Sequence, residues 1–265
     1  RVFVGQRSAS VSSSDLTPSA LREAAQRAVA MARLAPEDPY AGLAPEDRLA
    51  RGPFAELDVD DPTEISAAAL KLRALECEDA ARAIEGITNS EGAGVSAQQS
   101  HFFSAHTRGF RGGYASSRHS MSVSPIAGKG SHMQRDAWYS SMRDASELAS
   151  PQAVGRYAAE RALARLKSRK IATTQCPVLF ESPLAAGLLG SFVQAISGGA
   201  LYRKSTFLLD TLGKAAFPKH IDITEDPHVL KGKGSAPFDE EGVKTRARQV
   251  VEAGIVQGYF LSTYS

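Results

Sequence analysis

The chain has 265 residues, of which 43% are hydrophobic and 23% charged, so it can bury one or two substantial cores. Its net charge of +2 and the absence of long basic runs argue against direct nucleic-acid binding. Cys77 and Cys176 lie far apart and form no disulfide framework, so we expect a reducing, cytoplasmic location. No signal peptide is recognisable and neither end resembles a natural terminus, so we expect a part of a longer protein.

The first residues predict the end of an N-terminal domain over 1–34. Val2 and Val4 alternate with polar residues, which favours short strands. Thr17-Pro18 is a typical helix start, and the apolar residues behind it share one face: Leu21, Ala25, Ala28, Val29 and Ala32. Repeated Pro, Asp and Gly then predict a linker over residues 35–60.

Residues 61–170 are expected to form a central domain. Asp61-Pro62-Thr63-Glu64 is close to a capping box and predicts a helix that ends near Gly86, with a buried stripe of Ile65, Ala69, Leu72 and Leu75. Alternating small, polar and aromatic residues from Ile87 to Tyr139 predict three or four antiparallel strands. Ser150-Pro151 predicts a further helix, to about Ser168.

The last part, residues 171–265, is expected to begin a C-terminal domain. Short strands are predicted at 176–180, 206–210 and 221–224, followed by a hairpin that turns at Glu252-Ala253-Gly254. Helices that flank mainly antiparallel strands make the predicted fold class α+β, in several domains.

The stretch from Ser182 to Tyr202 contains no charged residue and allows three interpretations: a membrane span, a buried helix with a glycine turn, or a helix that carries the chemistry. Small and polar residues fill nearly half of it, which argues against a membrane span. Ser182 is a good N-cap, Pro183 suits the first helical position, and Gly198-Gly199 is a typical stop. We therefore expect a central helix buried on all sides.

Motifs for chemistry are nearly absent from the chain. None of the six histidines has the helical spacing of a metal site, and no phosphate loop, nucleophile elbow or calcium loop is complete. Two segments hint at peptide or partner binding: Arg203-Lys204-Ser205-Thr206, and the glycine-rich loop 231–242. For the loop, a plain solvated connection is the alternative interpretation.

Two long segments, CPVLFESPLAAGLLGSFVQAISGGALYRKSTFLLDTLGKAAFP and DPHVLKGKGSAPFDEEGVKTRARQVVEAGIVQGYFLSTYS, closely resemble the PmbA (TldE) branch of the TldD/PmbA family. GYASSRHSMSVS and TPSALREAAQRAVAMARL are also similar to it, and the resemblance covers essentially the whole chain. It implies a multi-domain fold of which only the end of the first domain, the central domain and the start of the third domain are present here.

The resemblance also implies a function. The family is associated with cytoplasmic peptide and protein processing, including the maturation of peptide antibiotics, and its PmbA members were labelled modulators of DNA gyrase. It implies a TldD-type metalloprotease partner that holds a zinc-like metal, in a two-subunit complex that encloses a proteolytic chamber around a peptide substrate. A homodimer in isolation is a further assembly to consider, and no membrane is involved.

The chain departs from the TldD branch at the motif helix. There, a His-Glu-x-x-x-His motif supplies metal ligands and a catalytic Glu; aligned through Arg203–Thr206, its positions fall on Gly190, Ser191 and Ala195. Glycine and alanine offer no ligand atom, and a serine hydroxyl cannot act as a carboxylate base. We therefore expect no catalytic residue, metal or cofactor in this chain.

Three hypotheses follow. The first is a TldE-like subunit that shapes the chamber and helps to hold a peptide, through Arg203, Lys204 and their neighbours. The second is a self-sufficient metallopeptidase whose ligands lie outside this chain. The third is a regulatory protein that acts on a gyrase-linked system without proteolysis.

Overall fold

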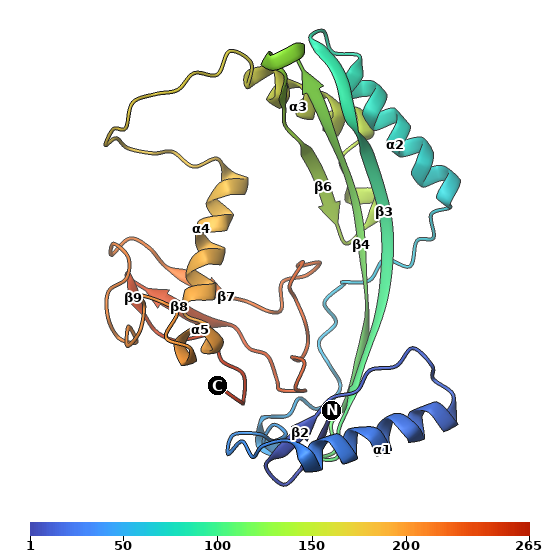
Figure 1. Cartoon of the computed structure of the whole chain (residues 1–265), viewed down its shortest axis with the longest axis vertical. Helices are drawn as coiled ribbons and strands as arrows, with labels where there is room; N and C mark the ends of the chain where they lie inside the picture. Colours follow the sequence, from blue (N-terminus) through green and yellow to red (C-terminus); the bar gives the residue numbers. More distant parts are fainter.

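The computed structural model describes all residues, 1–265, and has a long antiparallel sheet at its centre (Figure 1). Two helices, α2 and α3, pack on one half of this sheet. A small N-terminal unit lies at the far end of the two longest strands, and the C-terminal part with α4 lies to the other side of the sheet (Figure 1). The mixed helices and antiparallel strands confirm the predicted α+β class.

The N-terminal unit is an antiparallel hairpin with one helix. Strands β1 (Val2–Val4) and β2 (Arg7–Ala9) pair with each other, and α1 spans Pro18–Leu34. The Thr17 hydroxyl accepts a hydrogen bond from the Ala20 N–H, which confirms the predicted helix start. Only Ala28 and Ala32 of the predicted face are buried, because α1 contacts no more than this small hairpin and its surroundings.

The central sheet contains the four strands β3 (Ile87–Ala105), β4 (Arg111–Ala127), β5 (Gln134–Arg135) and β6 (Trp138–Met142). This confirms the antiparallel strands predicted between Ile87 and Tyr139. β3 pairs with β4 along its whole length, whereas β6 pairs only with residues His119–Val123 of β4. Beyond β6, the two long strands continue as a two-stranded arm toward the N-terminal unit (Figure 1).

Helices α2 (Ala67–Arg82) and α3 (Pro151–Ala164) cover the half of the sheet that contains β5 and β6, away from the arm. The Ser150 hydroxyl caps α3 as predicted, but α2 is capped by Ser66 rather than Asp61. The Asp61 carboxylate accepts hydrogen bonds from the N–H groups of Thr63 and Ala145 instead, so the predicted helix start was wrong.

Small residues let α2, α3 and the sheet approach closely. Cys77 and Ala81 of α2 are completely buried, together with three alanines of α3, Ala158, Ala159 and Ala162. Leu72 and Leu75, predicted to be buried, are 58% and 46% exposed. The buried face of α2 is set by its fit to α3 rather than by its largest side chains.

The segment expected to be a linker is partly packed. It contains a short 3-10 helix, η1 (Glu46–Arg48), and a second core in which Ala44, Leu49 and Ala50 pack with Phe110 from the tip of the arm and Phe238 from the C-terminal part. Short 3-10 turns also occur at η2 (Gly130–His132) and η3 (Ala145–Glu147).

The C-terminal part combines α4 (Ser182–Ala195) and α5 (Gly198–Tyr202) with a three-stranded sheet of β7 (Ile223–Glu225), β8 (Arg248–Glu252) and β9 (Ile255–Val256). The predicted final hairpin is confirmed, and β7 overlaps the predicted strand at 221–224. No strand forms at 176–180 or 206–210; Leu179 is 98% exposed, because neither segment has a neighbouring strand to pair with.

The uncharged stretch from Ser182 to Tyr202 forms two helices, α4 and α5, so Gly198-Gly199 begins a helix rather than closing one. Glu181, not Ser182, occupies the N-cap position. None of the helices in this structure combines the length and the apolar composition that crossing a bilayer requires.

Candidate functional site

Helix α4 carries the positions that the resemblance aligns with the metal motif. It is not buried on all sides as predicted: Leu184, Leu188 and Leu189 are 62%, 53% and 46% exposed, and Phe192 is its only buried residue. Phe192 and Ile196, just after the helix, anchor its C-terminal end against Val250, Val251 and Val256. The apolar residues of the first two turns meet no partner surface in this chain.

Gly190, Ser191 and Ala195 lie along this largely exposed helix. A Cβ atom added at Gly190 would meet no atom within 4 Å, and the Ser191 hydroxyl donates to the Gly187 carbonyl at 2.9 Å. The serine is therefore occupied by its own helix, as is common for serine within helices. No group of three or more His, Cys, Asp or Glu side chains converges in a way that could hold a metal ion.

The segment Arg203–Thr206 follows directly after α5. Arg203, Lys204 and Ser205 are exposed and Thr206 is half-buried. Backbone contacts fix its course, since the Ser205 N–H donates to the Ala200 carbonyl at 3.0 Å and the Thr206 hydroxyl accepts from the Leu208 N–H at 3.1 Å. The positively charged side chains of Arg203 and Lys204 are thus exposed at the end of α5, the helix that follows α4.

The loop 231–242 is anchored at both ends, unlike a plain solvated connection. Phe238 is 1% exposed and packs against Phe110 with ring centroids 5.0 Å apart. The Lys231 N–H donates to the Leu57 carbonyl at 2.9 Å. The loop therefore holds the C-terminal part against the arm and the extended segment before α2.

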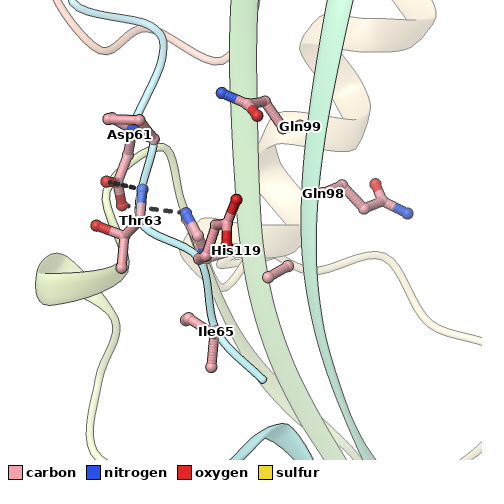
Figure 2. A pocket seen from close by; sticks show the side chains of 9 residues that line it. Asp61, Thr63, Ile65, Gln98, Gln99 and His119 are labelled. Atoms are coloured by element: carbon pink, nitrogen blue, oxygen red, sulfur yellow. Dashed lines mark hydrogen bonds and ion pairs between the residues drawn. The ribbon is translucent and has the colours of Figure 1, made fainter. Parts of the chain in front are cut away.

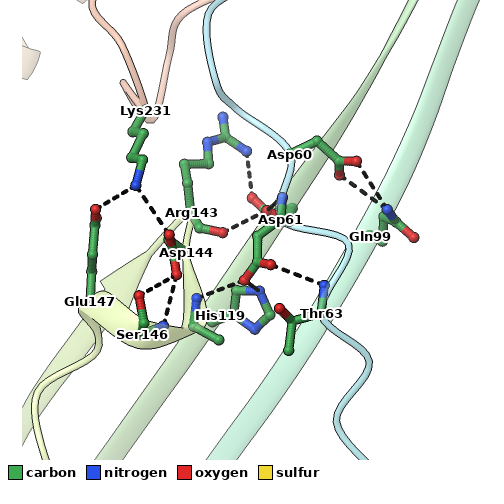
Figure 3. A network of polar contacts seen from close by, with 12 residues as sticks. Asp60, Asp61, Thr63, Gln99, His119, Arg143, Asp144, Ser146, Glu147 and Lys231 are labelled. Atoms are coloured by element: carbon green, nitrogen blue, oxygen red, sulfur yellow. Dashed lines mark hydrogen bonds and ion pairs between the residues drawn. The ribbon is translucent and has the colours of Figure 1, made fainter.

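A polar network surrounds this anchor (Figure 3). The Lys231 ammonium lies 2.6 Å from a Glu147 carboxylate oxygen and 3.1 Å from Asp144. Hydrogen bonds from Ser146 and Lys231 lower the pKa of Asp144 to about 2, and Glu147 and Asp144 raise the pKa of Lys231. The Asp144 carboxylate and the Lys231 ammonium thus stay charged over the whole physiological pH range.

Arg143 completes the bridge between the sheet and the C-terminal part. Its guanidinium donates to the Ser117 carbonyl and to the Lys233 carbonyl, both at 2.8 Å. Burial and the nearby Arg118 lower the pKa of Arg143. A hollow of about 200 Å³ lies among Arg143, Lys231 and the neighbouring aspartates.

His119 and Asp61 form the buried end of the network (Figure 2). His119 is 2% exposed, and its Nε2 lies 3.1 Å from Asp61 Oδ2. This is ion-pair distance, although neither ring nitrogen has a well-directed hydrogen-bond partner. Hydrogen bonds from Thr63 and Ala145, and the adjacent His119, lower the pKa of Asp61.

A cavity of about 290 Å³ lies between the segment 61–65 and the strands (Figure 2). His119 and Asp61 resemble an acid–base pair, but no Ser, Cys or Lys side chain lines the cavity with them, and the Asp61 carboxylate already accepts two backbone N–H groups. The pair therefore ties the segment 61–65 to the sheet. Sequence reasoning missed it because Asp61 and His119 are distant in the chain and no local motif joins them.

The architecture matches known structures over almost the whole chain. A Bacteroides thetaiotaomicron protein described as a candidate modulator of DNA gyrase superposes with a TM-score of 0.93 at 24% identity, covering 99% of this chain and 61% of that one. TldE from Thermococcus kodakarensis superposes with a TM-score of 0.70 at 20% identity, covering 94% and 56%. At these identities the likeness defines a class by its fold: TldE-like, multi-domain α+β proteins.

Sequence comparison identifies the family. Models of PmbA/TldA metallopeptidase domain 1, central domain and C-terminal domain match residues 1–32, 53–166 and 173–265, in that order. The chain belongs to the PmbA/TldD metallopeptidase family.

Two curated relatives place it in the PmbA branch. The metalloprotease PmbA of Escherichia coli O157:H7 is 41% identical over all of this chain, and a Haemophilus influenzae homolog of that protein is 39% identical. The chain spans 59% and 58% of the length of these two relatives.

Proposed function

We propose that this chain belongs to the TldE-like subunit of a two-subunit metalloprotease that processes peptides or unfolded proteins. In this proposal the catalytic metal is held by a TldD-type partner. The observation that carries it is that the residues aligned with the metal motif lie on a helix, α4, while their side chains, at Gly190, Ser191 and Ala195, supply no metal ligand. Membership of a metallopeptidase family supports the same assignment.

The surroundings of α4 fit a role as a partner surface. Its exposed leucines form an apolar face, and Arg203 and Lys204 stand exposed close to the following helix. Apolar surface rimmed by charge is typical of protein–protein contacts. We propose that the TldD-type subunit, the peptide, or both contact this region.

Metal content and activity test the proposal. The protein would be purified alone and after co-expression with a TldD-type protein, and each sample assayed for bound zinc and for cleavage of an unfolded casein substrate. We expect zinc and cleavage only in the co-expressed sample. Stoichiometric zinc together with cleavage by the isolated protein would overturn the proposal and favour a self-sufficient metallopeptidase.

A non-proteolytic role is the second candidate, because a structural relative is described as a candidate modulator of DNA gyrase. An affinity-tagged chain exposed to equal amounts of a TldD-type protein and gyrase separates the two. We expect retention of the TldD-type protein. Retention of gyrase alone would favour the regulatory role.

A further inference from the structure

The loop that follows β7 contacts the extended segment before α2. It reaches from the C-terminal sheet toward the central sheet (Figure 1), and the Lys231 N–H donates to the Leu57 carbonyl at 2.9 Å. The hollow of about 200 Å³ lies at this contact, and four aspartates line it together with Lys231 and Arg143: Asp58, Asp60, Asp61 and Asp144. The loop therefore closes one side of a charged hollow.

Residues 227–236 form a compact unit that is held by its own hydrogen bonds. The Ala236 N–H donates to the Pro227 carbonyl at 3.1 Å, which joins the two ends of the unit. The Ser235 hydroxyl is buried and donates to the Val229 carbonyl at 2.7 Å. The unit can therefore move as one body without losing its internal contacts.

Packing fixes the chain on both sides of this unit. Before it, β7 pairs with β8 in the C-terminal sheet. After it, Phe238 is 1% exposed and packs in one cluster with Phe54 and Phe110. Apolar packing of this kind is not weakened by salt. The two flanks are thus the fixed points about which the unit can turn.

Charge, rather than packing, holds the tip of the unit. Val229 and Leu230 are 51% and 66% exposed, so the apolar side chains of the tip bury little surface. The Lys231 ammonium contacts Glu147 and Asp144 (Figure 3), and these three side chains are between 31% and 43% exposed. Ion pairs with this exposure are weak and are screened by salt. A weak tip between packed flanks is the arrangement of a latch that can open reversibly.

The other contacts of the tip are also easily replaced. The Arg143 guanidinium donates to the Lys233 carbonyl at 2.8 Å, and water can take the place of this bond and of the bond to Leu57. Lys231 itself has a φ of 55°, in the left-handed region that residues other than glycine rarely adopt. Its contacts hold the backbone in this conformation, so their release favours opening.

We propose that residues 227–236 are a salt-sensitive lid, which Lys231 latches to Glu147 and Asp144. When the latch is screened, the lid turns away from Leu57 as one body and opens the charged hollow to solvent. The flanks at β7 and Phe238 stay in place. The lid goes beyond the proposed protease function and does not depend on it.

Hydrogen exchange of the amide at position 231 gives the first test, because this N–H bonds Leu57 only while the lid is closed. NMR spectroscopy would compare the parent chain with Lys231→Met and with a matched control, Lys233→Met. The control removes a second ammonium from the same loop, and Lys233 forms no ion pair.

After correction for the side chain at position 231, we expect at least about threefold faster exchange in Lys231→Met and a change within about 1.5-fold in Lys233→Met. Equal exchange in the two variants would overturn the proposal. If Lys231→Met does not fold, Glu147→Gln decides instead, since it weakens the latch and leaves the sequence of the lid unchanged. We expect faster exchange at position 231 in that variant too.

Salt gives the second test. Raising NaCl from 0.1 to 1 M shortens the screening length from about 10 to about 3 Å. We expect the Lys231 amide of the parent to exchange at least about threefold faster in high salt, and the amide at the same position of Lys231→Met to change by less than about 1.5-fold. An exchange rate of the parent that does not depend on salt would contradict the latch.

The Gln257 amide, which donates to the Val250 carbonyl at 2.8 Å, reports on the C-terminal core in the same spectra. We expect its exchange to be the same in all variants and at both salt concentrations. Equal acceleration of the amides at positions 231 and 257 would show unfolding of the whole C-terminal part and would overturn the lid.

Discussion

Helices α3 and α4 have the same length and a similar first turn, but they differ in how many of their residues are buried. Each has 14 residues and a proline in its first turn, and α3 contains three charged residues whereas α4 contains none. Yet five residues of α3 are buried and only one residue of α4 is. The more apolar helix is the less buried one.

The reason lies in the surfaces that each helix meets. α3 packs against both α2 and the sheet, where Gly155 and its alanines allow close approach. α4 meets the C-terminal core only at Phe192, and its leucines face outward. Burial therefore reports the available partner surface as much as the apolar content of the helix.

One substitution made in both helices gives the largest expected difference. A Cβ added at Gly155 would overlap the Cys77 carbonyl oxygen, whereas one at Gly190 meets nothing within 4 Å. We expect Gly155→Ala to lower the free energy of unfolding by about 3 kcal/mol, and Gly190→Ala to raise it by up to about 1 kcal/mol through helix propensity. Urea unfolding measures both, and similar values for the two variants would contradict the comparison.

Truncation of one apolar side chain in each helix tests the same difference in burial between α3 and α4. Val154 is 1% exposed and Leu188 is 53% exposed. We expect Val154→Ala to cost about 2 kcal/mol by leaving a cavity, and Leu188→Ala to change stability by less than about 0.5 kcal/mol. A large loss for Leu188→Ala in the isolated chain would show that α4 has a packing partner after all.

The stability of the central sheet and its helices is also expected to depend on pH, through Asp61. The pKa of Asp61 is held below its ordinary value of 3.8, so its stabilising effect is complete above that pH and is lost as the pH falls through the lowered pKa. We expect Asp61→Asn to cost about 1 kcal/mol at neutral pH and to reduce the loss of stability below pH 3.8. Urea midpoints across acidic pH check this; an unchanged pH profile in the variant would refute it.

The smallest effect is expected on α4 itself. If the motif positions carry no chemistry, Ser191→Ala should leave peptide cleavage by the co-expressed complex within about twofold of the parent, since the hydroxyl only bonds the Gly187 carbonyl. A loss of about a hundredfold in kcat with normal assembly would instead place Ser191 in the reaction.

The sequence predicted correctly those helix starts and turns that depend on residues a few positions apart. Thr17 and Ser150 cap their helices through hydroxyl contacts three residues ahead, and the final hairpin turns at Ala253-Gly254, both with positive φ. The prediction failed at Asp61, because its contact is not local. Its capping pattern was plausible, but its carboxylate serves Ala145, 84 residues away, and that contact has no local signature.

The sequence by itself determined the α+β class, the antiparallel pairing of the long strands and the starts of α1 and α3. These depend on residue chemistry and on short-range periodicity. Only the tertiary structure decided which helix faces are buried, that His119 meets Asp61, and that Lys231 anchors the C-terminal part. Each of these depends on surfaces brought together from distant parts of the chain, and local sequence patterns do not encode them.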